Sequence, residues 1–201
     1  MKIVEAEFIR SAVAPAGFLR DGYPEVAFAG RSNVGKSSLL NRLLGRGALA
    51  RVGATPGRTQ SVNYFRVNRR FYFVDLPGYG YARAGRQARQ AWAGLIDAYL
   101  RHAAPRLAVV LLVDGKVGAT AADVEAHGYL SGLGLRLVVA ATKMDQLTRG
   151  RWQPGLARIR QVLGAATDTP IIPFSAQTGE GARELWREIE AHVTAGASGK
   201  D

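Results

Sequence analysis

The sequence of 201 residues contains no cysteine, which excludes disulfide bonds and thiolate metal sites and permits a reducing cytoplasm. Its three histidines, His102, His127 and His192, are too widely separated to suggest a metal site. The longest apolar run, residues 107–113, is far shorter than a membrane span. Residues 1–15 carry charges where a signal peptide needs an apolar segment, and no lipidation motif is present. We therefore expect a soluble, cytoplasmic protein that is not attached to a membrane.

Acidic side chains are almost missing from one third of the chain. Residues 26–96 contain twelve Lys and Arg residues against a single acid, Asp75, while residues 1–25 and 97–201 are close to neutral. The net charge of +11 therefore resides in this block. A GC-rich genome would explain why Arg outnumbers Lys, but it would not remove the acids. We interpret the block as a surface that faces a polyanion, with a merely solvated basic face as the alternative.

Apolar runs of strand length alternate with helical patterns along the chain. Strands are predicted at 25–29, 62–67, 71–75, 107–114, 135–142 and 171–174, and helices near 36–44, 86–101, 121–132, 151–163 and 180–193. Several runs are apolar throughout, which is typical of parallel strands covered on both faces. The short connection NRR makes 62–67 and 71–75 an antiparallel hairpin. The pattern predicts an α/β fold: a six-stranded, mostly parallel sheet with one antiparallel strand and helices on both faces.

One loop matches a phosphate-binding pattern. Residues 30–37, GRSNVGKS, fit G-x-x-x-x-G-K-[ST] between a predicted strand and a predicted helix. Its glycines let backbone N–H groups converge at the positive end of the helix, where Lys36 reaches the β- and γ-phosphates and Ser37 offers a hydroxyl to Mg²⁺. An ordinary glycine-rich turn is the alternative, but the correct flanks favour a nucleoside triphosphate with Mg²⁺. The predicted contacts come from Gly30, Arg31, Ser32, Asn33, Val34, Gly35, Lys36 and Ser37.

A second acidic ligand is expected beside this loop. Asp75 ends the apolar run 71–75 and begins the sequence DLPG. Its position suits a ligand to a Mg²⁺-bound water, although an isolated acid in a basic stretch could also be a solvated charge partner. Gly78 has no side chain, so its N–H can approach a γ-phosphate. Leu76 and Pro77 complete this predicted part of the site.

The motif TKMD, residues 142–145, predicts which base is bound. The carboxylate of Asp145 can accept hydrogen bonds from the two adjacent donors of guanine, whereas adenine presents an acceptor there. The stem of Lys143 can lie across the base, and Thr142 can anchor the loop. Alone, the motif could also be a helix N-cap, but after two phosphate motifs it indicates GTP and not ATP. The predicted base-binding residues are Thr142, Lys143, Met144, Asp145, Phe174, Ser175 and Ala176, the last two through their backbone.

With these motifs the chain resembles the EngB-type ribosome-assembly GTPases (also called YihA or YsxC) of the TRAFAC class. It carries PEVAFAGRSNVGKSSLLNRLL, TPGRTQSVNYF, VDLPGYGYAR and TKMD in this order, and AEFIRSA near the start fits as well. It departs from the family at Gln146, where a Lys is common, and matches loosely over 115–132. The resemblance implies a three-layer P-loop GTPase (Ras-like) fold. It also implies a G domain at 25–194, an N-terminal extension at 1–24 packed on it, and a disordered tail at 195–201.

The resemblance also implies the function. It predicts a monomer that binds GTP or GDP with Mg²⁺, hydrolyses GTP slowly, and acts as a switch in assembly of the large ribosomal subunit on ribosomal RNA. Roles in ribosome biogenesis and in cell division or septation follow from the same likeness. The alternative is a GTPase switch of a signalling or RNA-modification pathway. If the chain acts in ribosome assembly, its nucleotide state would shape a surface that faces RNA. The arginines expected to form that surface are Arg46, Arg51, Arg58, Arg83, Arg86 and Arg89.

The glycine- and arginine-rich segment 45–60 would be the first switch, although TPGRTQ could also be a simple turn. Thr59 would ligate Mg²⁺, and the residues around it would contact nucleotide: Gly57, Arg58, Gln60 and Ser61. Lys36, Thr59 and Gly78 are the expected catalytic residues. Tyr79 stands where many GTPases place a water-positioning glutamine, so slow turnover is expected. By analogy with related GTPases, Asn33 could bring K⁺ beside the phosphates; a loop hydrogen bond from Asn33 is the open alternative.

Overall fold

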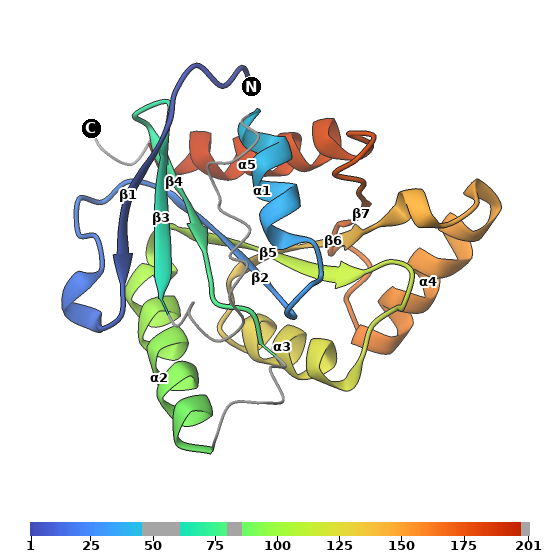
Figure 1. Ribbon diagram of the computed structural model, residues 1–201, viewed down its shortest axis with the longest axis horizontal. Helices are drawn as coiled ribbons and strands as arrows, with labels where there is room; N and C mark the ends of the chain where they lie inside the picture. Colours follow the sequence, from blue (N-terminus) through green and yellow to red (C-terminus); the bar gives the residue numbers. More distant parts are fainter. Residues whose placement is uncertain (46–60, 80–85, 198–201) are drawn as a thin grey trace.

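The computed structural model describes residues 1–45, 61–79 and 86–197, with a sheet lying between two layers of helices (Figure 1). The described strands are β1 (Ala6–Ala12), β2 (Glu25–Gly30), β3 (Val62–Val67), β4 (Phe71–Asp75), β5 (Leu107–Asp114), β6 (Arg136–Thr142) and β7 (Ile171–Pro173). The described α-helices are α1 (Lys36–Leu44), α2 (Arg86–Ala103), α3 (Ala121–Gly132), α4 (Trp152–Leu163) and α5 (Ala182–Ala197). Short 3₁₀ helices are η1 (Pro15–Gly17), η2 (Ala104–Arg106), η3 (Met144–Gln146) and η4 (Arg149–Arg151).

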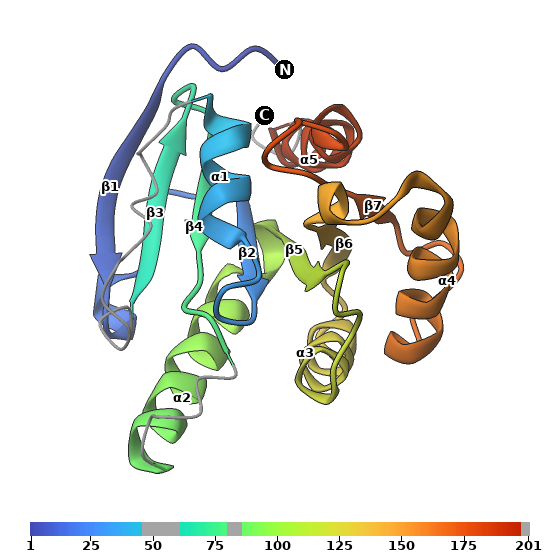
Figure 2. The ribbon, with the colours of Figure 1, turned by 45° about the vertical axis from the view of Figure 1, so that its right-hand side comes forward.

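The sheet confirms the predicted α/β class and corrects its strand number. The order is β1-β3-β4-β2-β5-β6-β7. Strands β4, β2, β5, β6 and β7 run parallel, while β3 is antiparallel to both β4 and β1, so the predicted hairpin is confirmed. The prediction of six strands is wrong, because β1 adds a seventh strand outside β3 (Figure 2). β1 is an edge strand with mostly exposed or half-buried residues and an irregular register between Phe8 and Arg10, so its sequence shows no clear strand period.

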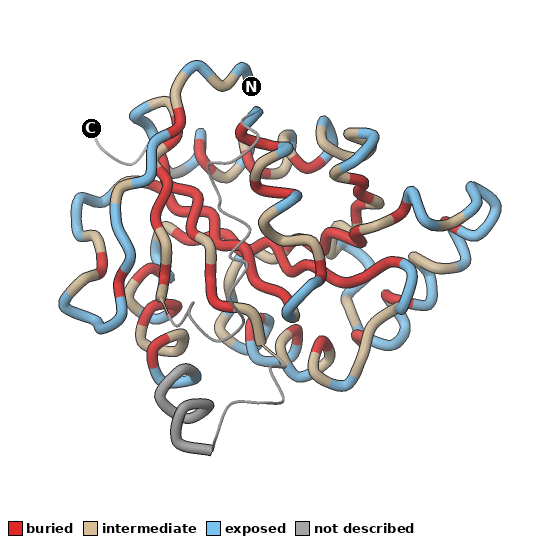
Figure 3. Tube along the Cα trace, viewed as in Figure 1, coloured by how far each residue is buried: buried red, intermediate tan, exposed pale blue. Residues whose placement is uncertain are grey.

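The central strands are apolar because helices cover both faces of the sheet. All eight residues of β5 are buried, as are all six of β2. Helices α1 and α5 pack on one face, and α2, α3 and α4 pack on the other. Buried residues are concentrated along these middle strands (Figure 3). This two-sided burial is what makes the strands readable in the sequence as continuous apolar runs.

The parallel strands bring their polar terminal residues to one edge of the sheet. β2 ends at Gly30, and its Phe28 lies beside Asp75, the last residue of β4. In the same way, Asp114 at the end of β5 lies beside Thr142 at the end of β6. Loops that follow parallel strands therefore meet at this edge, where ligands of open α/β sheets bind.

The C-terminal helix is longer than predicted. α5 continues to Ala197, so residues 195–197, expected to begin the tail, are helical. Residues 198–201 lie outside the described part, and the division into extension, domain and tail stays a prediction. In the described ranges, no helix combines the length and apolar character that crossing a bilayer requires.

A buried ion pair at the other end of the parallel strands, where β2 begins, holds the N-terminal segment in place. Glu25, 1% exposed at the start of β2, contacts Arg106 Nη2 at 2.9 Å and accepts the hydroxyl of Tyr99 at 2.8 Å. Arg106 also donates to the carbonyl of Leu19 at 3.2 Å. Burial raises the pKa of the Glu25 carboxyl, and Arg106 partly offsets that rise.

Replacing Arg106→Ala should therefore destabilise the fold strongly. The variant leaves Glu25 buried without its cation, which typically costs about 3–5 kcal/mol of the free energy of unfolding. Urea unfolding followed by circular dichroism measures the loss. Arg101→Ala, which removes the exposed pair between Arg101 and Asp97, is the control and should unfold close to the wild type. Equal midpoints for all three proteins would show that the buried pair contributes nothing.

Candidate functional site

Residues 30–37 form the tight turn from β2 into α1. Gly35 has φ of 98°, a left-handed conformation that glycine adopts without strain. Its carbonyl accepts the N–H of Leu39 at 2.9 Å, which starts the helix. A Cβ on Gly30 would lie 2.8 Å from Val34 Cγ1, so the loop folds back too closely for a side chain there. The structure thus forms the strand–loop–helix turn that the phosphate-binding pattern predicts.

The charged residues of the two phosphate motifs meet. Lys36 Nζ forms an ion pair with Oδ1 of Asp75, which ends the neighbouring strand β4. The two side chains are 12% and 13% exposed. Ser37, the next residue of α1, is half-buried. A lysine, a hydroxyl and a carboxylate of the kinds that bind a Mg²⁺-triphosphate therefore lie at one end of the site.

The residues that follow DLPG dock against the phosphate loop. The Tyr79 N–H donates to the carbonyl of Gly30 at 3.2 Å, and the Ser32 N–H donates to the carbonyl of Tyr79 at 3.1 Å. A Cβ on Gly78 would lie 3.1 Å from the backbone nitrogen of Ser32. Leu76 is buried and donates its N–H to Phe28 at 3.1 Å. Gly78 consequently lies directly beside the loop, as its predicted contact with a γ-phosphate requires.

The side chain of Tyr79 points to α3. Its hydroxyl donates to Asp123 Oδ1 at 2.9 Å, and Asp123 Oδ2 lies 3.5 Å from Arg31 Nε. The same carboxylate accepts the backbone N–H of Thr120 at 2.8 Å in a capping box at the start of α3. Burial, followed by the charge of Asp123, raises the pKa of the Tyr79 phenol far above its usual value. The phenol therefore stays protonated at neutral pH, with its hydroxyl engaged by Asp123.

Three contacts organise the opposite end of the site. The hydroxyl of Thr142 donates to the carbonyl of Val34 at 2.6 Å and so ties β6 to the phosphate loop. Lys143 Nζ pairs with Asp114 Oδ2 at 2.8 Å. In a separate contact, Ser175 Oγ donates to Asp145 Oδ1 at 2.6 Å. The loops after β6 and β7, predicted to bind the base, are therefore in direct contact.

Asp114 is a site residue that the sequence analysis missed. It is 5% exposed, and its Oδ1 accepts the N–H groups of Lys116 at 3.0 Å and Val117 at 3.1 Å. Burial alone would raise its pKa, but the bonds from Lys143 and from these N–H groups lower it overall. The carboxylate is thus ionised at neutral pH and holds Lys143. Asp114 terminates an apolar strand, which is the signal that identified Asp75.

A cavity of about 690 Å³ lies at the base end, between α1 and the loops after β6 and β7, and it is within the usual size range of ligand pockets. The predicted site residues that line it are Gly35, Thr142, Lys143, Asp145, Phe174 and Ala176. The lining residues that were not predicted are Ser38, Asn41, Arg42, Gly45, Gln146 and Gln177. Met144 is buried and donates its N–H to the Phe174 carbonyl at 3.2 Å, which joins the loops behind the cavity. The residues from α1 could not be predicted, because α1 meets these loops only in the folded chain.

Some predicted site residues are not placed. Gly57, Arg58, Thr59 and Gln60 lie outside the described residues, and with them the third predicted Mg²⁺ ligand. Ser61 is described, and its hydroxyl donates to Asn63 Oδ1 at 3.1 Å. Asn33 is exposed and has φ of 64°. The position of K⁺ beside Asn33 stays a prediction.

Comparison with known proteins identifies the family. The family described as "50S ribosome-binding GTPase" matches residues 25–143. A "Probable GTP-binding protein EngB" of Pelotomaculum thermopropionicum is 46% identical over 200 residues, covering 100% of both chains. The chain belongs to the EngB family of GTP-binding proteins. It is therefore a GTPase, and it shares with the EngB family the recognition of GTP and GDP.

Solved structures agree with the family. A crystal structure of a probable EngB protein superposes with a TM-score of 0.72 at 27% identity, covering 85% of this chain and 99% of that one. Era, crystallised with MgGDPNP and nucleotides 1506-1542 of 16S ribosomal RNA, gives a TM-score of 0.62 at 22% identity. That match covers 85% of this chain and 56% of Era, and it shows the shared fold alone.

Tyr79→Phe should leave GTP hydrolysis almost unchanged. The hydroxyl is bound to Asp123 and has a raised pKa, so its removal takes nothing from the reacting groups. Single-turnover hydrolysis at saturating GTP is the measurement, with Lys36→Ala as the inactive reference. A loss of about 100-fold or more, the size expected for a general acid or base, would place the phenol at the reaction centre instead.

Proposed function

We propose that this protein uses its GTP- or GDP-bound state as a switch during assembly of the large ribosomal subunit, and that it hydrolyses GTP slowly. The observation that carries the site assignment is the Thr142–Val34 hydrogen bond. It joins the loop that leads into Lys36, the partner of Asp75, to the end of β6, after which Asp145 follows. Phosphates and base would therefore be bound by one continuous surface.

Each part of the site has a proposed task. Lys36 and the backbone N–H groups of residues 30–37 neutralise and orient the phosphates. Ser37, Asp75 and Thr59 hold Mg²⁺, which when bound offsets charge on the transferred phosphoryl group. The N–H of Gly78 registers the γ-phosphate. Turnover compared in KCl and NaCl decides whether K⁺ near Asn33 contributes, since equal rates would exclude it.

The base end supplies specificity. Asp145 presents a carboxylate at the rim of the cavity, and Ser175 fixes one of its oxygens at 2.6 Å. In this proposal the second oxygen of Asp145 and the backbone of Ala176 bind guanine. Lys143, held by Asp114, carries an aliphatic stem that can cover the base. This polar arrangement favours guanine over adenine, because adenine would leave the carboxylate unpaired.

The ribosome is proposed as partner on two grounds. The matching family is described as ribosome-binding, and Era, which shares the fold, was crystallised with ribosomal RNA. The acid-poor block 26–96 supplies a charge surplus suited to RNA. By the same family likeness we infer roles in ribosome biogenesis and in cell division or septation, for a cytoplasmic monomer.

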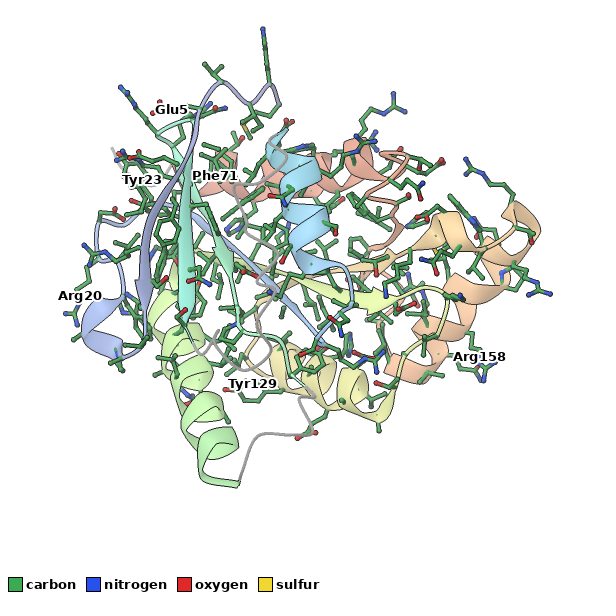
Figure 4. All side chains as sticks on the ribbon, in the orientation of Figure 1. Glu5, Arg20, Tyr23, Phe71, Tyr129 and Arg158 are labelled. Carbon is green, nitrogen blue, oxygen red and sulfur yellow. The ribbon has the colours of Figure 1, made fainter. Side chains whose placement is uncertain are left out.

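The basic side chains that the structure describes limit where an RNA-binding surface could lie. Arg66 and Arg69 pair with Glu7 and Glu5 of the N-terminal segment, so they are partly neutralised. Arg20 and Arg158, both exposed, lie at opposite ends of the molecule (Figure 4). The arginines proposed to face RNA are Arg46, Arg51, Arg58, Arg83, Arg86 and Arg89, whose side chains all lie outside the described part.

Asp145→Asn should change the base that is bound. The amide donates where the carboxylate accepted, so affinity for GDP is expected to fall about 100-fold or more. Xanthosine diphosphate, which has a carbonyl in place of the 2-amino group, should bind the variant better than GDP. Equilibrium titration with both nucleotides measures the exchange, and Asp168→Asn, at an exposed acid, is the control. Retained GDP preference in Asp145→Asn would remove Asp145 from the site.

Binding to purified large ribosomal subunits should depend on the nucleotide. Sedimentation with a non-hydrolysable GTP analogue should recover more protein than with GDP, because the γ-phosphate is what distinguishes the two proposed states of the switch. Added salt should weaken the association steeply, as for other contacts with phosphate backbones. Small subunits provide the control. Association that ignores both nucleotide and salt, or that fails altogether, would favour a signalling or RNA-modification GTPase.

A further inference from the structure

Two loops that bracket the base end of the cavity are joined by an ion pair outside it. Arg149 follows the loop that carries Asp145, and Glu180 follows the loop that carries Ser175. Arg149 Nη1 donates to Glu180 Oε1 at 2.7 Å, and Nη2 donates to Oε2 at 2.5 Å. The two parallel bonds make the fork arrangement that gives an arginine–carboxylate pair its geometric specificity.

Arg149 is itself held in position. Its guanidinium lies 4.0 Å from the centroid of the Trp152 ring, and Trp152 is buried at the start of α4. The indole N–H of Trp152 donates to the carbonyl of Leu147 at 3.3 Å. The stacking and the planar fork restrict the guanidinium before the ion pair forms, so less conformational freedom is lost in the contact.

Glu180 connects this pair to Asp145 through a chain of hydrogen bonds. The backbone carbonyl of Glu180 accepts the N–H of Ser175 at 3.0 Å. The hydroxyl of Ser175 accepts the N–H of Thr178 at 3.1 Å and donates to Asp145 Oδ1 at 2.6 Å. A movement of Glu180 away from Arg149 would therefore shift Ser175 and release the Asp145 carboxylate from the Ser175 hydroxyl.

We propose that Arg149 and Glu180 form a clamp that positions the base-binding loops and slows nucleotide release. The proposal rests on the proposed role of Asp145 in binding guanine. Neither clamp residue is among those that line the cavity, so both are positioning residues that act through Ser175 and Asp145. The clamp joins the segments after β6 and β7, whereas Lys36 and Asp75 pair at the ends of β2 and β4, so its effect should be the same with GDP and with GTP.

The test is the dissociation rate of fluorescently labelled GDP and of a labelled non-hydrolysable GTP analogue, measured by stopped flow. Arg149→Ala should speed release of both nucleotides by the same factor, about two- to five-fold, which is the scale for an exposed pair. In steady-state hydrolysis the variant should raise KM and leave kcat unchanged, because chemistry at the phosphates is untouched. Arg149→Lys, which keeps the charge but loses the fork, should give an intermediate rate.

A double-mutant cycle separates the clamp from general loosening. Arg149→Ala combined with Glu180→Ala should release nucleotide no faster than the faster single variant. Arg136→Ala, which removes an exposed pair with Glu188 at 3.1 Å between β6 and α5, is the matched control and should behave as the wild type. Unchanged release from Arg149→Ala, or single effects that multiply in the double variant, would overturn the clamp.

Measurements on the wild-type protein distinguish failure of the clamp from failure of the proposed guanine-binding role of Asp145. Wild-type protein that releases labelled GDP and labelled ADP at the same rate would overturn the base-binding role of Asp145. A wild type that retains GDP selectively, together with clamp variants that match it, overturns the clamp alone. An effect on the GTP analogue but not on GDP would also overturn the clamp. It would mean that Arg149 acts through the γ-phosphate and not through the base.

Discussion

The hydroxyl of Thr142 sets the distance between the two halves of the site. Its bond of 2.6 Å to the carbonyl of Val34 joins the end of β6 to the middle of the phosphate loop. The loop after β2 needs a fixed partner because its glycines supply no side-chain packing of their own. Thr142 is 3% exposed, so water competes little for this bond. Every proposed contact with base and phosphate depends on this alignment.

Two lysine–aspartate ion pairs have the same arrangement in the site. A lysine in the loop after one strand pairs with the aspartate that ends the adjacent parallel strand. Lys36 after β2 pairs with Asp75 of β4, and Lys143 after β6 pairs with Asp114 of β5. The parallel register makes both pairs possible, since it brings neighbouring strand ends to one edge. The proposed phosphate lysine and the proposed base lysine are thus held in the same way.

Much of this could be predicted from sequence because the signals are local. Strands β2, β4, β5 and β6 are nearly continuous apolar runs that end at glycine or a polar residue, so their bounds were predicted to within one residue. The phosphate loop and the Asp75 motif have fixed spacing, and the structure brings Lys36 and Asp75 together. The contrary case is β1, whose edge position leaves few buried residues and so no clear period.

The contacts that sequence could not supply are those between distant segments. Asp123 binds Tyr79 across 44 residues, and Glu180 binds Arg149 across 31. Each looks locally like an ordinary residue: Asp123 completes a helix cap, and Arg149 and Glu180 resemble solvated surface charges. Only the packing of α3 against the phosphate loop, and of the two base-end loops against each other, gives them partners.

The most direct test of the central claim is calorimetric titration of the wild-type protein with GDP and with ADP in the presence of Mg²⁺. If one continuous surface binds both phosphates and guanine, GDP should saturate a single site per chain while ADP gives no measurable binding heat. Equal affinity for the two nucleotides, or no binding of GDP, would contradict the account.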